Sequence, residues 1–103
     1  MREMENHARD AAQFLKAMGN EYRLVILCHL VEDELSVGEL NERIDLSQSS
    51  LSQHLGVLRE CGLVTTRRES QTIYYRLANG SAVEIMRTLY NHYCSPYQRR
   101  GRQ

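Results

Sequence analysis

Three cysteines provide the side chains of this sequence that are best suited to covalent chemistry, and they lie far apart, at Cys28, Cys61 and Cys94. An odd number of widely spaced cysteines is not the disulfide framework of a small secreted protein. Cytosolic cysteine pairs that do oxidise are usually transient sensors. The chain has no Cys-x-x-Cys motif, so a thiol oxidoreductase is not indicated and we do not expect an enzyme.

A second set of side chains is suited to hydrogen bonding with nucleic acid. A run rich in serine and glutamine extends from Gln48 to His54, and three arginines follow further along the chain. Glutamine can pair with adenine through two hydrogen bonds, serine can reach bases or phosphates, and arginine suits phosphate or minor-groove contact. The expected DNA contacts are Gln48, Ser49, Ser50, Ser52, Gln53, His54, Arg67, Arg68 and Arg76. Taken alone, the serine-rich run is more typical of a capped, solvated helix start than of a DNA contact.

The charges are divided unevenly between the two halves of the chain. Residues 1–45 carry five basic and ten acidic side chains, whereas residues 46–103 carry eight basic and three acidic ones. All eight basic residues of the second half are arginines, which suit contacts with phosphates and base edges. The split is typical of a protein with one positive face for a polyanion, although such splits also arise by chance.

Length and composition indicate one ordinary globular unit. With 103 residues, 42% of them apolar and 25% charged, the chain fits a single domain spanning residues 1–103. Its longest apolar run, at residues 24–30, is far shorter than the roughly 20 residues that a membrane span needs. The first six residues lack the apolar core of a signal peptide. We therefore expect a cytoplasmic protein with no membrane partner.

Hydrophobic periodicity and capping residues predict the elements that must position these groups. Helices are expected at about residues 4–18, 21–31, 36–44, 47–61 and 82–94, and strands at about residues 63–68 and 72–77. Asn20, Ser36 and Ser47 are the expected N-caps, Gly62 is the expected glycine after a helix end, and Asn79-Gly80-Ser81 is an expected turn and cap. Ser95-Pro96 is expected to end the last helix, and residues 99–103 are expected to be disordered.

This order of elements predicts a winged helix-turn-helix. The fold class is mainly α (α+β), with five helices and a two-stranded β-hairpin as the wing. The connection at residues 44–47 is short, as the motif requires, and the helix after it would read DNA. Leu51, Leu55 and Leu58 fall on one face of that helix, which leaves its polar side chains for the major groove.

The sequence resembles the ArsR-type family of winged-helix repressors over about residues 10–95. The resemblance is carried by residues 16–24, by Leu35-Ser36-Val37-Gly38-Glu39-Leu40, by Leu46-Ser47-Gln48-Ser49-Ser50-Leu51-Ser52-Gln53-His54-Leu55, by Leu58-Arg59, by Gly62-Leu63-Val64, and in the wing by Arg67-Arg68-Glu69 and Tyr74-Tyr75-Arg76-Leu77. At the wing tip, Ser70-Gln71 replaces the Gly-Arg of many members, so phosphate contact there should fall to Arg67 and Arg68.

The resemblance to this family implies a homodimer, formed through the first and last helices, that binds an inverted-repeat operator in double-stranded DNA. The resemblance implies a dimer seam made of Met4, Ala11, Phe14, Ile85, Met86, Leu89 and Tyr93. The alternative for these stripes is that they are ordinary core.

Two common metal sites of the family do not match this sequence. Ser36 and Gly38 stand where one site has a Cys-x-Cys pair, and the last helix offers only Glu84 and His92 for the other. No metal and no cofactor are therefore expected. A metal site with ligands from distant elements remains an alternative, as do a regulator without a sensor and an activator that displaces a nucleoid silencer.

The positions of Cys28 and Cys94 resemble the paired cysteines of the family's sulfide- and redox-responsive subgroup. The resemblance implies that oxidants or reactive sulfur species, such as persulfides, link the two thiols and thereby change the protein's affinity for DNA. The alternative is that Cys28 is a small core residue in apolar surroundings that dull its reactivity. Cys61 is expected to be core or a bystander.

Overall fold

The computed structural model describes the backbone of residues 2–94 and the side chains of residues 3–93, so the tail expected at residues 99–103 and the Cys94 side chain lie outside the described residues. The elements in chain order are α1 (Arg2–Met18), α2 (Glu21–His29), β1 (Leu35–Ser36), α3 (Val37–Arg43), α4 (Gln48–Glu60), β2 (Val64–Glu69), β3 (Thr72–Leu77), α5 (Ser81–Leu89) and a π-helical turn, η1 (Tyr90–Cys94). The winged-helix order expected from the sequence is confirmed.

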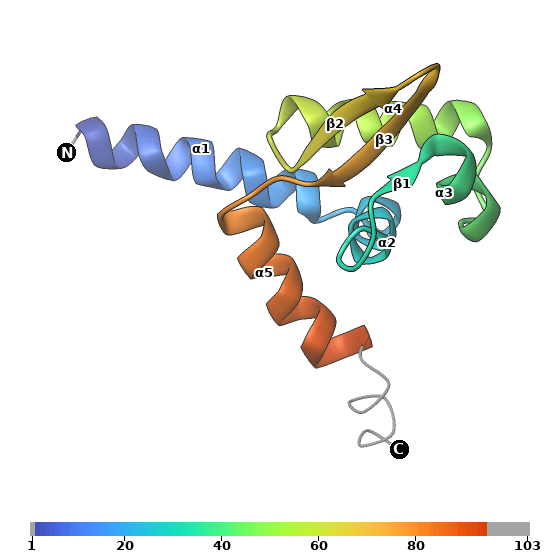
Figure 1. Cartoon of the computed structure of the whole chain (residues 1–103). Helices are drawn as coiled ribbons and strands as arrows, with labels where there is room; N and C mark the ends of the chain where they lie inside the picture. The colour runs from blue at the N-terminus through green and yellow to red at the C-terminus, as the bar shows by residue number, and fades with distance from the viewer. Residues whose placement is uncertain (1, 95–103) are drawn as a thin grey trace.

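The core lies where α2, α3, α4 and the sheet meet. Sixteen buried apolar side chains form one cluster, which includes the three leucines expected on the inner face of α4. Figure 1 shows α1 projecting away from this body, the hairpin lying over α4, and α5 descending on another side. None of the described helices is both long and apolar enough to cross a membrane.

Local capping chemistry sets the helix starts as the sequence predicts. The Asn20 side-chain oxygen accepts from the backbone N–H groups of Tyr22 (2.9 Å) and Arg23 (3.1 Å). Ser36 and Glu39 form a reciprocal capping box at the start of α3. The Ser47 hydroxyl accepts from the backbone N–H of Ser50 at 3.1 Å. Each cap satisfies N–H groups that have no partner within their own helix.

Three features differ from the expectations. The sheet has three strands rather than two, because β1 pairs antiparallel with β3 through Leu35↔Tyr75 and Ser36↔Tyr74. Gly80, with φ +89°, is the N-cap of α5, and no side chain caps that helix. The last helix is α-helical only as far as Leu89 and continues as the π-helical turn. Such turns are rare and are frequent at functional sites.

Candidate nucleic-acid interface and thiol site

The reader helix α4 presents a face of small and neutral polar side chains. Gln48, Ser49, Ser52 and Gln53 are exposed, while the leucine face of the same helix is buried. The preceding turn is held by Asn41, whose side-chain nitrogen donates to the carbonyl oxygen of Leu46 at 2.8 Å. The exposed N-terminal half of α4 therefore has the bulk and the hydrogen-bonding groups that suit a major groove.

Two of the expected DNA contacts on α4 are less open. Ser50 is half-buried, and its backbone N–H serves the Ser47 cap. His54 is also half-buried, and its ring turns toward α2, where it stacks on Tyr22 with ring centroids 6.0 Å apart. His54 was expected on the DNA-facing side, but the helical period of 3.6 carries position 54 round toward the neighbouring helix.

The wing displays its arginines in unequal ways. Nε of Arg67 donates to Glu34 at 2.7 Å, and Nη1 donates to Glu69 at 3.0 Å. The hydrogen bond to Glu34, and then the one to Glu69, raise the pKa of Arg67. Its guanidinium carbon also lies 4.8 Å from the centre of the Tyr74 ring. Arg67 is thus held by carboxylates of its own chain.

The other two wing arginines are less engaged. Arg76 is exposed, and its Nε donates to the Thr65 hydroxyl at 3.4 Å. Arg68 is also exposed and, among the side chains that the structure describes, has no ion pair. Of the two arginines expected to take over phosphate contact near the tip, Arg68 is therefore the one whose charge is available.

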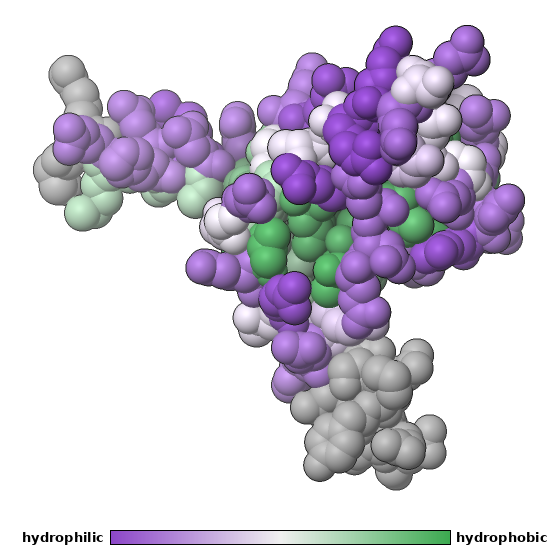
Figure 2. All heavy atoms as spheres, in the orientation of Figure 1, coloured by the Kyte–Doolittle hydropathy of each residue, from purple (hydrophilic) through white to green (hydrophobic). Residues whose placement is uncertain are grey.

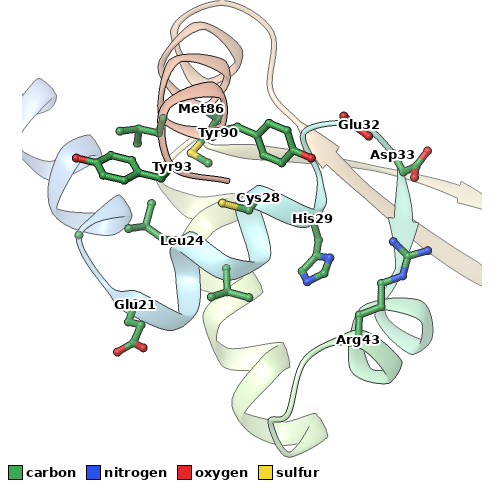
Figure 3. A pocket seen from close by; sticks show the side chains of 13 residues that line it. Glu21, Leu24, Cys28, His29, Glu32, Asp33, Arg43, Met86, Tyr90 and Tyr93 are labelled. Carbon is green, nitrogen blue, oxygen red and sulfur yellow. The ribbon is translucent and has the colours of Figure 1, made fainter. Parts of the chain in front are cut away.

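Cys28 lies on α2 at the wall of a groove of about 970 Å³. Figure 3 shows its side chain leaving α2 on the side where Met86 of α5 and Tyr93 of η1 lie, while the Tyr90 ring extends the other way and His29 and Arg43 lie farther along the groove. The thiol is half-buried, and Cys28 packs against the hydrophobic core while it also lines the groove. It borders a hollow that a small reagent can enter.

The opposite wall of the groove is built by the turn that contains the second expected cysteine, Cys94. Tyr90 and Tyr93 line the groove, and both belong to η1, whose last residue is Cys94. The third cysteine, Cys61, is half-buried at the C-terminal end of α4 and packs against the core. Cys61 was expected to be core or a bystander, and it contributes to the packing of the core.

Burial, and then the positive charge of Arg43, lower the pKa of His29 beside the groove. A neutral histidine ring is a common metal ligand. Among the described side chains, however, no three His, Cys, Asp or Glu residues lie close enough together to hold a metal ion.

Most residues of the expected dimer seam reach the surface of the protomer. Met4 is 69% exposed and Tyr93 is 54% exposed, Ala11 is exposed, and Phe14, Ile85 and Leu89 are half-buried. Met86 differs, because it is completely buried in the protomer's own core. It therefore supports α5 from inside and does not itself present surface to a partner.

Two contributors to these sites escaped the sequence analysis. In the sequence, Glu34 falls between two expected helices, and Arg23 falls in the first turn of the helix expected at residues 21–31. Their partners lie 33 and 31 residues away in the chain, at Arg67 and His54. Periodicity and capping patterns extend over a few residues, so they carry no signal for such pairs.

Comparisons with known proteins agree with this geometry. Residues 20–66 match the family model described as bacterial regulatory protein, arsR family. The transcriptional activator HlyU of Vibrio cholerae serotype O1 is 50% identical over 98 residues, which cover 95% of this chain and 91% of HlyU. The biofilm growth-associated repressor of Agrobacterium fabrum is 46% identical over 93 residues, which cover 90% of this chain and 80% of that repressor.

A solved structure, reduced HlyU from Vibrio cholerae N16961, matches with a TM-score of 0.84 and 50% identity, covering 92% of this chain and all of that one. A polar reader helix and a hairpin on this scaffold define a winged-helix regulator of transcription. The chain belongs to the arsR family of bacterial regulatory proteins. It is a transcription regulator and not an enzyme, and the expected family is confirmed.

Proposed function

We propose that this chain forms a cytoplasmic homodimer that binds inverted-repeat operator DNA. We also propose that reaction of Cys28 with Cys94 lowers its affinity for that DNA. One observation carries the switch. Cys28 points into a groove whose opposite wall, Tyr90 and Tyr93, belongs to the same five-residue turn as Cys94. A bond between the two sulfurs ties α2 to the last turn of the chain's described part.

The DNA-binding half of the proposal is supported by the exposed polar face of α4 and by the arginines of the wing. Gln53 and Gln48 are the proposed base readers, because glutamine can make two hydrogen bonds to adenine. Arg68 and Arg76 are the proposed phosphate contacts, since such contacts fix register and orientation without reading sequence. The remaining polar residues of the reader face, Ser49, Ser50 and Ser52, complete the proposed surface.

The homodimer is supported by the shape of α1. Figure 1 shows this helix projecting from the body, and Figure 2 shows apolar side chains along one edge of its otherwise hydrophilic surface. Met4 and Leu15 are 69% and 54% exposed. Helices in proteins gain most of their stability by packing an apolar face, and much of the apolar edge of α1 has no cover within the protomer. A second copy would supply the cover.

The switch needs no cofactor, and its chemistry balances in two ways. With hydrogen peroxide, the two thiols form a disulfide and peroxide is reduced to two waters. With a low-molecular-weight persulfide, a cysteine thiolate takes the outer sulfur and the donor leaves as a thiol. The new protein persulfide then reacts with the other thiol to give a disulfide and hydrogen sulfide, or with a second protein persulfide to give a trisulfide and hydrogen sulfide.

Two relatives support different parts of this proposal. One solved HlyU structure is of the reduced protein, and a reduced state is the one in which we propose that this chain binds DNA. HlyU is a named activator and the Agrobacterium fabrum relative a named repressor. We propose repression by operator occupancy for this chain.

DNA release by native and cysteine-variant proteins tests the switch. A duplex enriched from a random library by the reduced native protein serves as operator, and binding is measured before and after treatment with a persulfide donor or peroxide. Native protein and Cys61→Ser should lose affinity on treatment, whereas Cys28→Ser and Cys94→Ser should not. Equal release by all four proteins would contradict the role of this pair.

A further inference from the structure

Arg23 joins three helices at one point of the molecule. It lies in the first turn of α2, where its backbone N–H donates to the Asn20 cap at 3.1 Å. Its Nε donates to the carbonyl oxygen of Ala17, in the last turn of α1, at 2.6 Å. Its Nη1 lies 3.4 Å from Nδ1 of His54 on the reader helix α4. Both side-chain contacts are partly buried.

The contact with Ala17 anchors the arginine. The last carbonyl groups of a helix have no partner within that helix, and a cation is favourable at this end. The guanidinium is planar and rigid, so a bond made by Nε fixes the direction in which the Nη atoms point. The position of the Nη1 donor that faces His54 is therefore fixed by α1 and α2.

His54 is held from the same side by Tyr22. The two rings are stacked, with an angle of 26° between their planes. His54 directly follows Gln53, one of the exposed polar residues proposed to read bases, and it lies on the inward-turned side of the same helix turn. A rotation of α4 about its axis would break the contacts of His54 and move Gln53 together.

The other attachments of α4 are of a different kind. Leu51, Leu55 and Leu58 bury their side chains in the core, and hydrophobic attraction is non-directional. A row of leucines holds a helix against its neighbours but specifies its rotation less sharply than a directed hydrogen bond does. A bidentate base contact requires side-chain placement within about 0.5 Å and 10–20°.

We propose that Arg23 and His54 are a positioning pair that fixes the rotation of α4, so that its polar face meets the bases in register. This inference rests on the proposed reading of DNA by α4 and adds the residues that make the reading specific. Nδ1 of His54 serves as the acceptor. At position 54, asparagine would place a side-chain oxygen where it can replace Nδ1 as the acceptor, whereas leucine would keep similar bulk without an acceptor.

The experiment measures affinity for two duplexes, one enriched from a random library by the native protein and one of scrambled sequence. The variants are Arg23→Met, His54→Leu, the double variant and His54→Asn. Arg9→Met serves as the matched control, because Arg9 is an exposed arginine on α1 that contacts only Asn6 at 3.3 Å among the described side chains. Thermal unfolding curves identify one temperature at which the native protein and all variants are folded. All binding measurements are made at that temperature.

We expect Arg23→Met and His54→Leu each to weaken binding to the enriched duplex about tenfold, a loss of the size that one misplaced base contact produces. Binding to the scrambled duplex should change less than about twofold, because phosphate contacts do not depend on base register. The double variant should bind as each single variant does, since directly coupled residues are non-additive. His54→Asn and Arg9→Met should keep the native ratio between the duplexes.

A native ratio in Arg23→Met and His54→Leu, additive losses in the double variant, or equal losses on both duplexes would overturn the pairing. Failure of His54→Asn to restore the ratio lost in His54→Leu would also contradict it. If the native protein enriches no duplex, the proposed DNA reading fails first and the positioning pair fails with it. The two failures are therefore distinguishable.

Discussion

The reader helix and the wing were both expected to contact DNA, but they differ in what positions their side chains. Features close together in the sequence position those of the reader helix, whereas contacts between distant residues hold part of the wing. On α4, short-range features suffice: a serine cap, a buried leucine face and an exposed run of neutral polar side chains. In the wing, the arginines have the expected positions, but Arg67 is paired with Glu34 and Glu69. A basic residue at the surface is a candidate phosphate contact only if its charge is not already satisfied.

This difference separates specificity from general affinity. The neutral side chains of α4 can discriminate among bases but contribute little to long-range attraction. The wing arginines attract any phosphate backbone and give binding its salt dependence. Substitutions in the two regions should therefore change different observables, and each prediction below tests that division.

The largest expected effect is on sequence discrimination. Gln53→Ala should lower affinity for the enriched duplex about tenfold or more, since a good bidentate base contact discriminates by about 1–3 kcal/mol. Affinity for scrambled DNA should stay nearly native. Gln13→Ala, at an exposed glutamine of α1, is the control. Equal weakening on both duplexes would mean that Gln53 does not read a base.

The next effect concerns the two neighbouring wing arginines. Arg68→Ala should weaken binding to every duplex and reduce the slope of log affinity against log salt by about 0.9, the value for one phosphate contact. Arg67→Ala should reduce the slope less, because its guanidinium is already paired with carboxylates. Titrations at several salt concentrations decide the order. A larger change for Arg67 would contradict the proposed division of charge.

A smaller gain is expected when the pairing partner is removed. Glu34→Gln should strengthen binding to all duplexes about two- to fivefold, the range set by an exposed ion pair, and should steepen the salt dependence. Glu42→Gln removes an exposed carboxylate that has no ion pair among the described side chains, and it should strengthen binding less. Equal effects of the two substitutions would show that Glu34 does not restrain Arg67.

The smallest effect is on stability at the wing tip. Ser70 has φ +61°, a left-handed conformation that favours glycine. Ser70→Gly should raise the free energy of unfolding by about 0.5 kcal/mol and the melting temperature by about 2–4 °C. Ser70→Ala keeps a Cβ and should bring no gain. Melting curves measure both, and a lower melting temperature for the glycine variant would contradict the strain.

Much of the fold could be predicted because its signals are local. The caps at Asn20, Ser36 and Ser47 act over two or three residues, and the leucine spacing of α4 is a single helical period. The strand β1 could not be found, because two residues are too few to show alternation. It exists through its pairing with β3, about 40 positions further along the chain.

The sites were predicted less completely for the same physical reason. Residue types predicted the polar face of α4 and the arginines of the wing, and most of these side chains are exposed. The contacts of Arg23 with His54 and of Arg67 with Glu34 depend on the folded arrangement. The burial of Met86 and the inward turn of His54 likewise follow from how the helices pack.

The central claim is that Cys28 and Cys94 react with each other. The direct test treats the fully reduced protein with a persulfide donor and, in parallel, with peroxide, and then determines the intact mass and digests the protein. We expect one peptide that joins Cys28 to Cys94, with added sulfur or a plain disulfide after persulfide and a plain disulfide after peroxide, while Cys61 stays reduced. Two unreacted thiols at Cys28 and Cys94, or a bond to Cys61 instead, would contradict the account.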